Sequence, residues 1–206
     1  MKSFIKKAVT LAALASLCVF AAGCGSSDNS SKSASSDKKE VTVGVTPGIH
    51  AEIMEQVKKE AAKQGITIKI MEFSDYVTPD VALSNKEIDM NSYQHKPYMD
   101  NLVKDKGLKI VSIGQTVVAP IGLYSHKIKS LDEVKDGMTV AVPNDPTNGA
   151  RGLLLLQKAG FIKIKDGVKY PTPQDITDNP KHLQIKELEA AQIPRSLDDV
   201  DFAAIN

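Results

Sequence analysis

The body of the chain alternates short β-branched or apolar runs with amphipathic helical patterns, and this alternation limits the folds open to it. Residues 41–45 form a β-branched run, and residues 50–64 carry apolar side chains at helical spacing before Gly65. Further strands are predicted at residues 66–71, 108–113, 138–142 and 200–205, and further helices at residues 79–85, 97–106 and 148–159. Strands that alternate with helices predict an α/β fold with a largely parallel sheet.

Ligands of such folds bind at the carboxyl ends of the strands, so the segments that follow the strands are the candidate site. One of these segments lies within residues 89–98, which hold two of the five tyrosines and one of the four histidines in a chain that is 5% aromatic. Tyrosine needs an apolar environment for its ring and a hydrogen-bond partner for its hydroxyl. This segment is therefore one wall of a small-molecule pocket or, alternatively, an ordinary loop with partly buried tyrosines.

A second candidate segment, residues 143–152, joins a predicted strand to a predicted helix. Thr147 or Asn148 can cap this helix, whose first N–H groups are then free to bind an anion. Arg151 adds a planar cation in what we expect to be the first turn, and a guanidinium can bind a carboxylate through two parallel hydrogen bonds. The segment lacks the Gly-Lys-Ser/Thr ending of a phosphate loop. We predict a carboxylate receptor, with a solvated Arg151 as the alternative.

The N-terminus has the pattern of an export signal. Lys2, Lys6 and Lys7 precede an apolar run over residues 8–22, which is shorter than the roughly 20 residues that span a bilayer. The run ends at Cys24 in a sequence similar to a bacterial lipobox. We predict a signal peptide at residues 1–23, lipid attachment at Cys24 and a disordered Ser/Lys/Asp-rich tether at residues 24–39. Cys18 is removed with the signal peptide, and Cys24 would carry the lipid. The exported part therefore has no cysteine available for a disulfide or a metal site.

Several functions are disfavoured by the sequence. A net charge of +1 and the absence of a basic stripe argue against nucleic acid as a partner. The histidines are scattered without the spacing of metal ligands, so neither a metal nor another cofactor is predicted. A hydrolase with His95 or His126 as base would need a nucleophile motif such as Gly-x-Ser-x-Gly, which the sequence does not contain. We do not expect an enzyme.

The chain resembles the NlpA/MetQ family of lipoproteins, the methionine-binding components of bacterial ABC importers. The stretches that carry the resemblance follow the family's order and are residues 43–50, 72–79, 88–98, 143–151 and 193–197. The resemblance implies a periplasmic-binding-protein-like fold with two α/β lobes, residues 40–117 and 118–206, joined by hinge crossings near 117–121 and 203–206. Methionine would lie in the cleft between the lobes.

The resemblance also assigns the site residues. Residues Tyr76, Tyr93 and Tyr98 match the family's aromatic side-chain pocket, although Phe is common at the position of Tyr93. Three further residues match those that address the polar end of the ligand: His95, Arg151 and Asn206. Because removing one partner of a buried ion pair costs roughly 3–5 kcal/mol, Arg151→Ala should weaken binding more than Tyr76→Phe.

The function implied is that of a lipid-anchored, extracytoplasmic protein that captures methionine, a related amino acid or a dipeptide for a permease and its ATPase, and closes around it. A metal-capturing lipoprotein and a surface adhesin without a small ligand are the alternatives. Members of the family usually continue for several dozen residues beyond the stretch that resembles residues 201–206. We therefore expect either a fragment or a truncated gene, with the first lobe incomplete.

Overall fold

The structure, a computed structural model, describes residues 39–206. The predicted signal peptide, Cys24 and all but the last residue of the predicted tether lie outside the described residues. The described residues contain two main sheets, each with its own helices. No helix among residues 39–206 is long and apolar enough to cross a bilayer.

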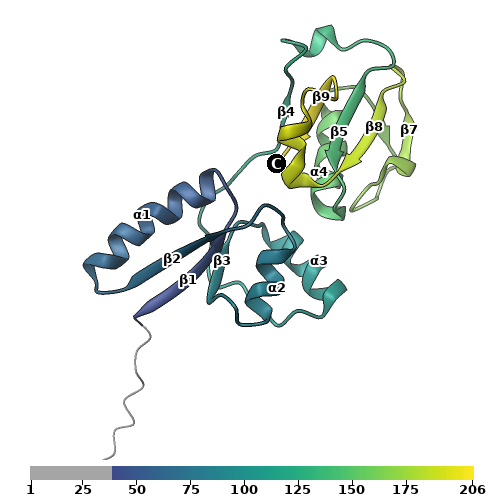
Figure 1. Cartoon of the computed structure of the whole chain (residues 1–206). Helices are drawn as coiled ribbons and strands as arrows, with labels where there is room; N and C mark the ends of the chain where they lie inside the picture. The colour runs from purple at the N-terminus through teal and green to yellow at the C-terminus, as the bar shows by residue number, and fades with distance from the viewer. Residues whose placement is uncertain (1–38) are drawn as a thin grey trace, which may run out of the picture. The chain divides into compact units, whose positions relative to one another are not determined.

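The first sheet has the order β2-β1-β3, and β1 pairs in parallel with both neighbours. Its strands are β1 (Glu40–Val45), β2 (Thr67–Glu72) and β3 (Met90–Ser92). The helices that follow them are α1 (Ile49–Lys63), α2 (Thr78–Ser84) and α3 (Lys96–Lys106). Figure 1 shows α1 along one side of this sheet and α2 along the other.

The side chains of β1 alternate between these two faces, as a pleated strand requires. Val43 and Val45 are fully buried and belong to one apolar cluster with Met54 of α1. Gly44 points to the opposite face, where a Cβ atom would lie 2.7 Å from Cδ1 of Ile88. The glycine therefore lets the segment that follows α2 approach the sheet closely.

The second sheet has the order β4-β9-β5-β8, in which only the β4–β9 pair is antiparallel. Its strands are β4 (Gly122–Tyr124), β5 (Thr139–Pro143), β8 (Gln184–Leu188) and β9 (Phe202–Ile205). The remaining elements are α4 (Pro146–Lys158), an antiparallel pair of β6 (Lys163–Ile164) with β7 (Ile176–Asp178), and three short 3-10 helices: η1 (Leu131–Glu133), η2 (Pro173–Asp175) and η3 (Ala190–Ser196).

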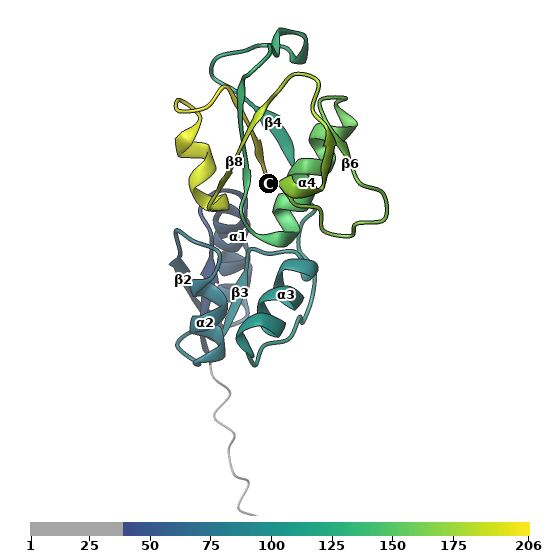
Figure 2. The ribbon, with the colours of Figure 1, turned by 90° about the vertical axis from the view of Figure 1, so that its right-hand side faces the viewer.

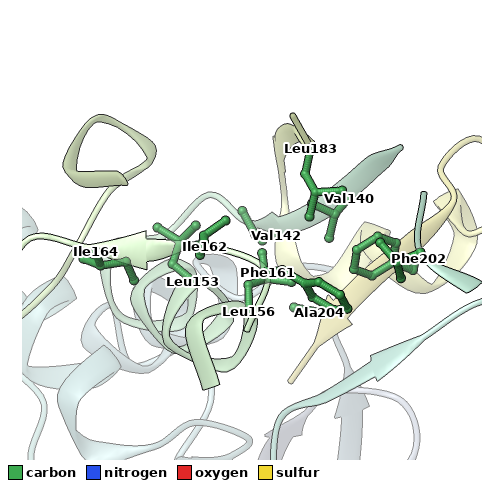
Figure 3. Close-up of a cluster of buried hydrophobic side chains, with 11 residues drawn as sticks. Val140, Val142, Leu153, Leu156, Phe161, Ile162, Ile164, Leu183, Phe202 and Ala204 are labelled. Atoms are coloured by element: carbon green, nitrogen blue, oxygen red, sulfur yellow. The ribbon is translucent and has the colours of Figure 1, made fainter. Parts of the chain in front are cut away.

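Two apolar cores lie on the two faces of this sheet. Val140, Val142 and Phe202 point toward α4, where they meet Leu153 and Leu156. Ala141 of β5 and Ala203 of β9 point the other way, toward η3. There they form a smaller cluster with Ile193, Leu197 and Val200. Figure 2 shows α4 and the yellow coil of η3 on opposite sides of the sheet, and Figure 3 shows the larger cluster.

Most of the predicted elements are confirmed, and the sheets are largely parallel as expected. The strand predicted at residues 108–113 is wrong, because residues 108–121 form neither helix nor strand. Val111 and Ile113, whose spacing suggested a strand, are each 78% exposed. A strand needs a hydrogen-bonded neighbour, and none of the described strands pairs with this segment.

Gly149 in the first turn of α4 predicts a stability effect. A Cβ atom on this residue would lie 2.6 Å from the carbonyl oxygen of Pro143, a backbone atom that cannot swing aside. Alanine is favoured over glycine in a helix by about 1 kcal/mol, but relieving this overlap should cost about 1–3 kcal/mol. We expect Gly149→Ala to lower the free energy of unfolding measured in urea.

Gly114 provides the matched control. No atom lies within 4 Å of the position of its Cβ, and its φ is not in the left-handed region. Gly114→Ala should therefore leave stability unchanged or raise it slightly. Equal stability of the two variants would show that α4 can move away from β5 without loss.

Candidate functional site

The predicted site residues gather at the carboxyl edges of the two sheets. Since β1, β2 and β3 run parallel, the segments after them leave the first sheet at one edge. The same holds in the second sheet for β5, β8 and β9, which are followed by α4, η3 and Asn206. This is the edge at which α/β folds bind ligands.

Three tyrosines from two segments form a single aromatic cluster. The ring of Tyr76 lies 5.9 Å from that of Tyr93 and 6.2 Å from that of Tyr98, and the last two are 6.3 Å apart. The hydroxyls of Tyr93 and Tyr98 both donate to the backbone carbonyl of Tyr76, at 2.6 and 3.0 Å. One carbonyl thus fixes the orientation of two rings, and we call the three residues the tyrosine wall.

A turn upstream of α2 presents Tyr76 to the other two rings. The Asp75 carboxylate accepts hydrogen bonds from the backbone N–H groups of Val77 and Thr78, at 2.8 and 2.7 Å. A short carboxylate that bonds the backbone two and three residues on is typical of a tight turn. The sequence Ser74-Asp75-Tyr76 therefore places the tyrosine at the turn rather than within the helix.

The tyrosine wall carries no charge. Burial raises the pKa of Tyr93 and of Tyr98 well above the ordinary value for a phenol, and the Asp75 carboxylate raises both further. Burial also raises the pKa of Tyr76. The three hydroxyls therefore stay protonated at neutral pH, and the wall offers neutral rings with fixed polar edges.

His95 joins this wall to the start of α4. Its Nδ1 accepts the backbone N–H of Tyr98 and so caps α3, which means that Nδ1 carries no proton. In the neutral ring the proton is then on Nε2, which lies 2.9 Å from Oδ1 of Asn148. The helix cap thus selects the tautomer that donates to Asn148.

The start of α4 differs from the prediction. The helix is capped by Asp145 and not by Thr147 or Asn148, since the Asp145 carboxylate accepts the backbone N–H groups of both, at 3.1 and 2.8 Å. The N–H of Gly149 donates to the carbonyl of Asp145. These N–H groups are occupied, so the predicted anion site on free backbone N–H groups is wrong.

Arg151 lies in the second turn of α4 and not in the first as predicted, because the helix begins at Pro146. Its Nη1 donates to Oδ1 of Asn148 at 2.8 Å, and its Nη2 to the carbonyl of Ala119 at 3.2 Å. Burial lowers its pKa, and the Asp145 carboxylate opposes that shift, so the guanidinium remains charged. Two of its five N–H donors thus have acceptors within the described part of the chain, which leaves donors for a carboxylate.

Asn206 follows β9 at the same edge. Its carboxamide is hydrogen-bonded to the Tyr76 hydroxyl. Its Oδ1 is buried, with no hydrogen-bond partner among the described residues. An unpaired buried acceptor is unusual in a native protein and is suited to a donor group of a ligand.

The structure therefore brings all six predicted ligand residues into one chain of contacts, from Tyr76, Tyr93, Tyr98 and His95 on the first sheet's side to Arg151 and Asn206 on the other. Asn148 is the residue that sequence reasoning missed, since it was considered only as a helix cap. It is 1% exposed, and its Oδ1 accepts from both His95 and Arg151. No sequence pattern predicts that Asn148 is a shared acceptor. Its position three residues before Arg151 does put these two residues on one helix face.

Replacing Asn148 tests the importance of this shared acceptor. Asn148→Ala leaves the His95 and Arg151 donors without their partner, and unpaired buried groups cost about 1–3 kcal/mol. We expect that loss in the free energy of unfolding. Asn85→Ala, at an exposed asparagine whose side chain donates to the Glu87 carboxylate, should change stability by less than about 0.5 kcal/mol. Equal effects of the two substitutions would contradict a special role for Asn148.

Other places in the described part of the chain offer less. No three His, Cys, Asp or Glu side chains within residues 39–206 are grouped so as to hold a metal ion. A shallow surface pocket beside β4 and η1 is lined by residues such as Leu123, Leu131 and Phe202, and none of the predicted site residues lines it.

Comparison with known proteins gives the family. A family model described as NlpA lipoprotein matches residues 41–206. The chain belongs to the NlpA lipoprotein family. Over 184 residues it is 53% identical to the D-methionine-binding lipoprotein MetQ of Salmonella typhi, an alignment that covers 88% of this chain and 65% of the relative. The chain thus spans about two thirds of the length of that relative.

Solved structures that this chain resembles confirm the fold class. A crystal structure of the methionine-binding protein MetQ matches with a TM-score of 0.80 at 53% identity, covering 82% of this chain and 71% of the other. A nutrient-binding protein from Burkholderia cenocepacia, solved bound to methionine, matches with a TM-score of 0.76 at 49% identity, covering 81% and 71% of the two chains. The predicted periplasmic-binding-protein-like α/β fold is therefore correct, whereas the boundary between lobes at residue 117 stays a prediction.

Proposed function

We propose that this NlpA family chain is a substrate-binding protein that captures methionine and delivers it to an ABC importer, without chemistry on the ligand. The relatives named above are methionine-binding proteins, and one was solved with methionine bound. The observation in this chain that supports the proposal is the contact chain from the tyrosine wall through His95 and Asn148 to Arg151. This arrangement combines an aromatic surface with the Arg151 cation, which has N–H donors available for a ligand.

The tyrosine wall suits the methionine side chain. A thioether gains about 0.3–1.5 kcal/mol from each good aromatic contact, and each buried methylene contributes about 0.8 kcal/mol. The wall offers three rings within 6.3 Å of one another, so one sulfur can contact more than one ring edge. Its neutral hydroxyls already have acceptors or donors, so they place no unpaired charge against the apolar ligand.

The polar end of an amino acid needs a cation and an acceptor, and both are present. Arg151 has N–H donors left for the α-carboxylate, and a guanidinium can bind it in a bidentate geometry. The buried Oδ1 of Asn206 is an acceptor for the α-ammonium group. We assign Tyr76, Tyr93 and Tyr98 to the ligand side chain, and His95, Arg151 and Asn206 to its polar end.

Mass spectrometry of small molecules released from the purified protein tests this function against its alternatives. Methionine, a related amino acid or a methionine-containing dipeptide supports capture for import. A co-purified metal ion would instead support a metal-capturing lipoprotein, and the release of no small molecule, with no binding on addition of methionine, would favour an adhesin.

We further propose that the protein is exported and held at a membrane surface by lipid on Cys24. The support is the sequence pattern at residues 1–24 together with membership of a lipoprotein family. Two or more acyl chains anchor a protein stably, whereas one chain gives marginal binding. Cys24→Ala should abolish incorporation of labelled palmitate and release the protein from membranes. Unchanged labelling of this variant would reject Cys24 as the attachment site.

A further inference from the structure

Asp80 in α2 is an acidic residue buried without a cation. It is 0% exposed, and its Oδ1 accepts two hydrogen bonds, from Nδ2 of Asn91 at 2.8 Å and from Nε2 of Gln94 at 2.6 Å. No lysine, arginine or histidine within residues 39–206 forms an ion pair with it. An unpaired buried carboxylate is very unfavourable, and such groups usually neutralise instead.

The second oxygen of Asp80 has no donor. Its Oδ2 is buried without a hydrogen-bond partner in the described part of the chain, and so is Oε1 of Gln94, on the amide that already donates to Oδ1. The Tyr93 hydroxyl also faces the carboxyl, but its proton is donated to the carbonyl of Tyr76. A single proton on Oδ2 makes Asp80 neutral, so no charge is buried. It also turns Oδ2 into a hydrogen-bond donor.

We propose that Asp80 is a positioning residue of the tyrosine wall, which holds Asn91 and Gln94 on either side of Tyr93 and does so as a neutral carboxylic acid at pH 7. The Tyr93 hydroxyl, which faces the carboxyl, is the acceptor for the Oδ2 proton. The consequence for ligand affinity rests on the proposed function; the protonation state does not.

The surroundings of the carboxyl support this assignment. Burial raises the pKa of Asp80, while the hydrogen bonds donated by Asn91 and Gln94 oppose that shift without reversing it. Tyr93 is the titratable group that faces the carboxyl. Tyr98 and Asp75 are the other titratable groups of this cluster, and they interact electrostatically with Tyr93. None of the three carries a positive charge, so none stabilises an Asp80 anion.

The protonation state is tested without ligand, by measuring the urea unfolding of the full chain and of Asp80→Asn between pH 5 and pH 7. The folded-state pKa of Asp80 lies above its unfolded value of about 3.9, so above that pH the folded state holds a proton that the unfolded state has lost. Stability from Asp80 therefore falls as pH rises. The unfolding constant of the wild type relative to Asp80→Asn should increase about tenfold per pH unit, or about 100-fold over this range.

Because Asp80→Asn replaces only this acid, all other titrations cancel in the ratio. A ratio that stays flat would show Asp80 ionised in both states and overturn the proposal. Infrared difference spectra provide a second readout on the wild type itself. We expect a protonated-carboxyl band at pH 7 that Asp80→Asn lacks, and its absence from the wild type would also overturn the proposal.

The positioning role is tested by comparing Asp80→Asn with Asp80→Ala. The asparagine keeps the acceptor for Asn91 and Gln94 and places N–H donors at Oδ2, so calorimetry should give methionine affinity within about threefold of the wild type. The alanine should weaken binding at least about tenfold, in line with the loss of buried hydrogen bonds. Equal affinity of Asp80→Ala and the wild type would refute positioning.

Near-ultraviolet circular dichroism compares Asp80→Asn with Asp80→Ala in the absence of ligand. The chain has no tryptophan and five tyrosines, three of them in the wall, so the tyrosine signal is dominated by this region. Asp80→Asn should retain the signal and Asp80→Ala should lose part of it. If the wild type binds no methionine, the proposed function fails, whereas dichroism and the pH dependence still decide the role of Asp80.

Discussion

Arg151→Ala is expected to weaken methionine binding by about 100-fold. Removing one partner of a buried ion pair costs roughly 3–5 kcal/mol, and Arg151 is only half-buried, so the lower end applies; about 3 kcal/mol corresponds to about 100-fold. Tyr76→Phe keeps the ring and removes only a hydroxyl that is hydrogen-bonded to Asn206, so it should weaken binding by tenfold or less. Calorimetric titration of both variants measures the difference.

A ligand analogue separates the loss of charge recognition from a general disturbance of the site. Methionine amide has the same side chain and ammonium group but no carboxylate. The wild type should bind it far more weakly than methionine, whereas Arg151→Ala should bind the two about equally. If Arg151→Ala still distinguishes the two ligands as strongly as the wild type does, another group recognises the carboxylate and our assignment of Arg151 is wrong.

Leu156→Ala should be strongly destabilising. Leu156 is 0% exposed and packs in the core that α4 shares with β5 and β9 (Figure 3). Truncation of a buried leucine leaves a cavity and costs about 2–5 kcal/mol. This loss would appear as a lower midpoint in urea unfolding. Because β9 leads directly to Asn206, loosening this core should also weaken ligand binding.

Leu154→Ala is the matched control, two residues away on the same helix. Leu154 is 43% exposed, and leucine and alanine differ little in helix propensity, so we expect a loss below about 1 kcal/mol. Equal losses for the two variants would mean that the α4 core is not packed as described.

The first half of the fold could be predicted because its elements carry local signals. The run at residues 41–45 and the helical pattern that ends before Gly65 became β1 and α1. The strand β8, Gln184–Leu188, was missed because its two apolar residues, Ile185 and Leu188, are three positions apart and so do not alternate, and because its partner β5 is distant in the sequence. Residues 108–113 show the converse error, since an apolar alternation forms a strand only when another strand lies beside it.

The residues that form the site could be predicted, but the hydrogen bonds that link them could not. The family resemblance supplied the tyrosines, His95 and Arg151, and the structure places them together. The shared acceptor Asn148 depends on two donors that come from 53 residues upstream and three residues downstream, which spacing along the chain does not reveal. Asp80 resembles an ordinary acidic residue in the first turn of a helix, and only its burial sets it apart.

The most direct test is a calorimetric titration of the full chain with methionine at pH 7, in its L- and D-forms, with norleucine as the control ligand. We predict saturable one-to-one binding of at least one enantiomer, and weaker binding of norleucine, in which a methylene replaces the sulfur that contacts the tyrosine wall. Absence of binding by both enantiomers, or equal affinity for methionine and norleucine, would contradict a methionine site at Tyr76, Tyr93, Tyr98 and Arg151.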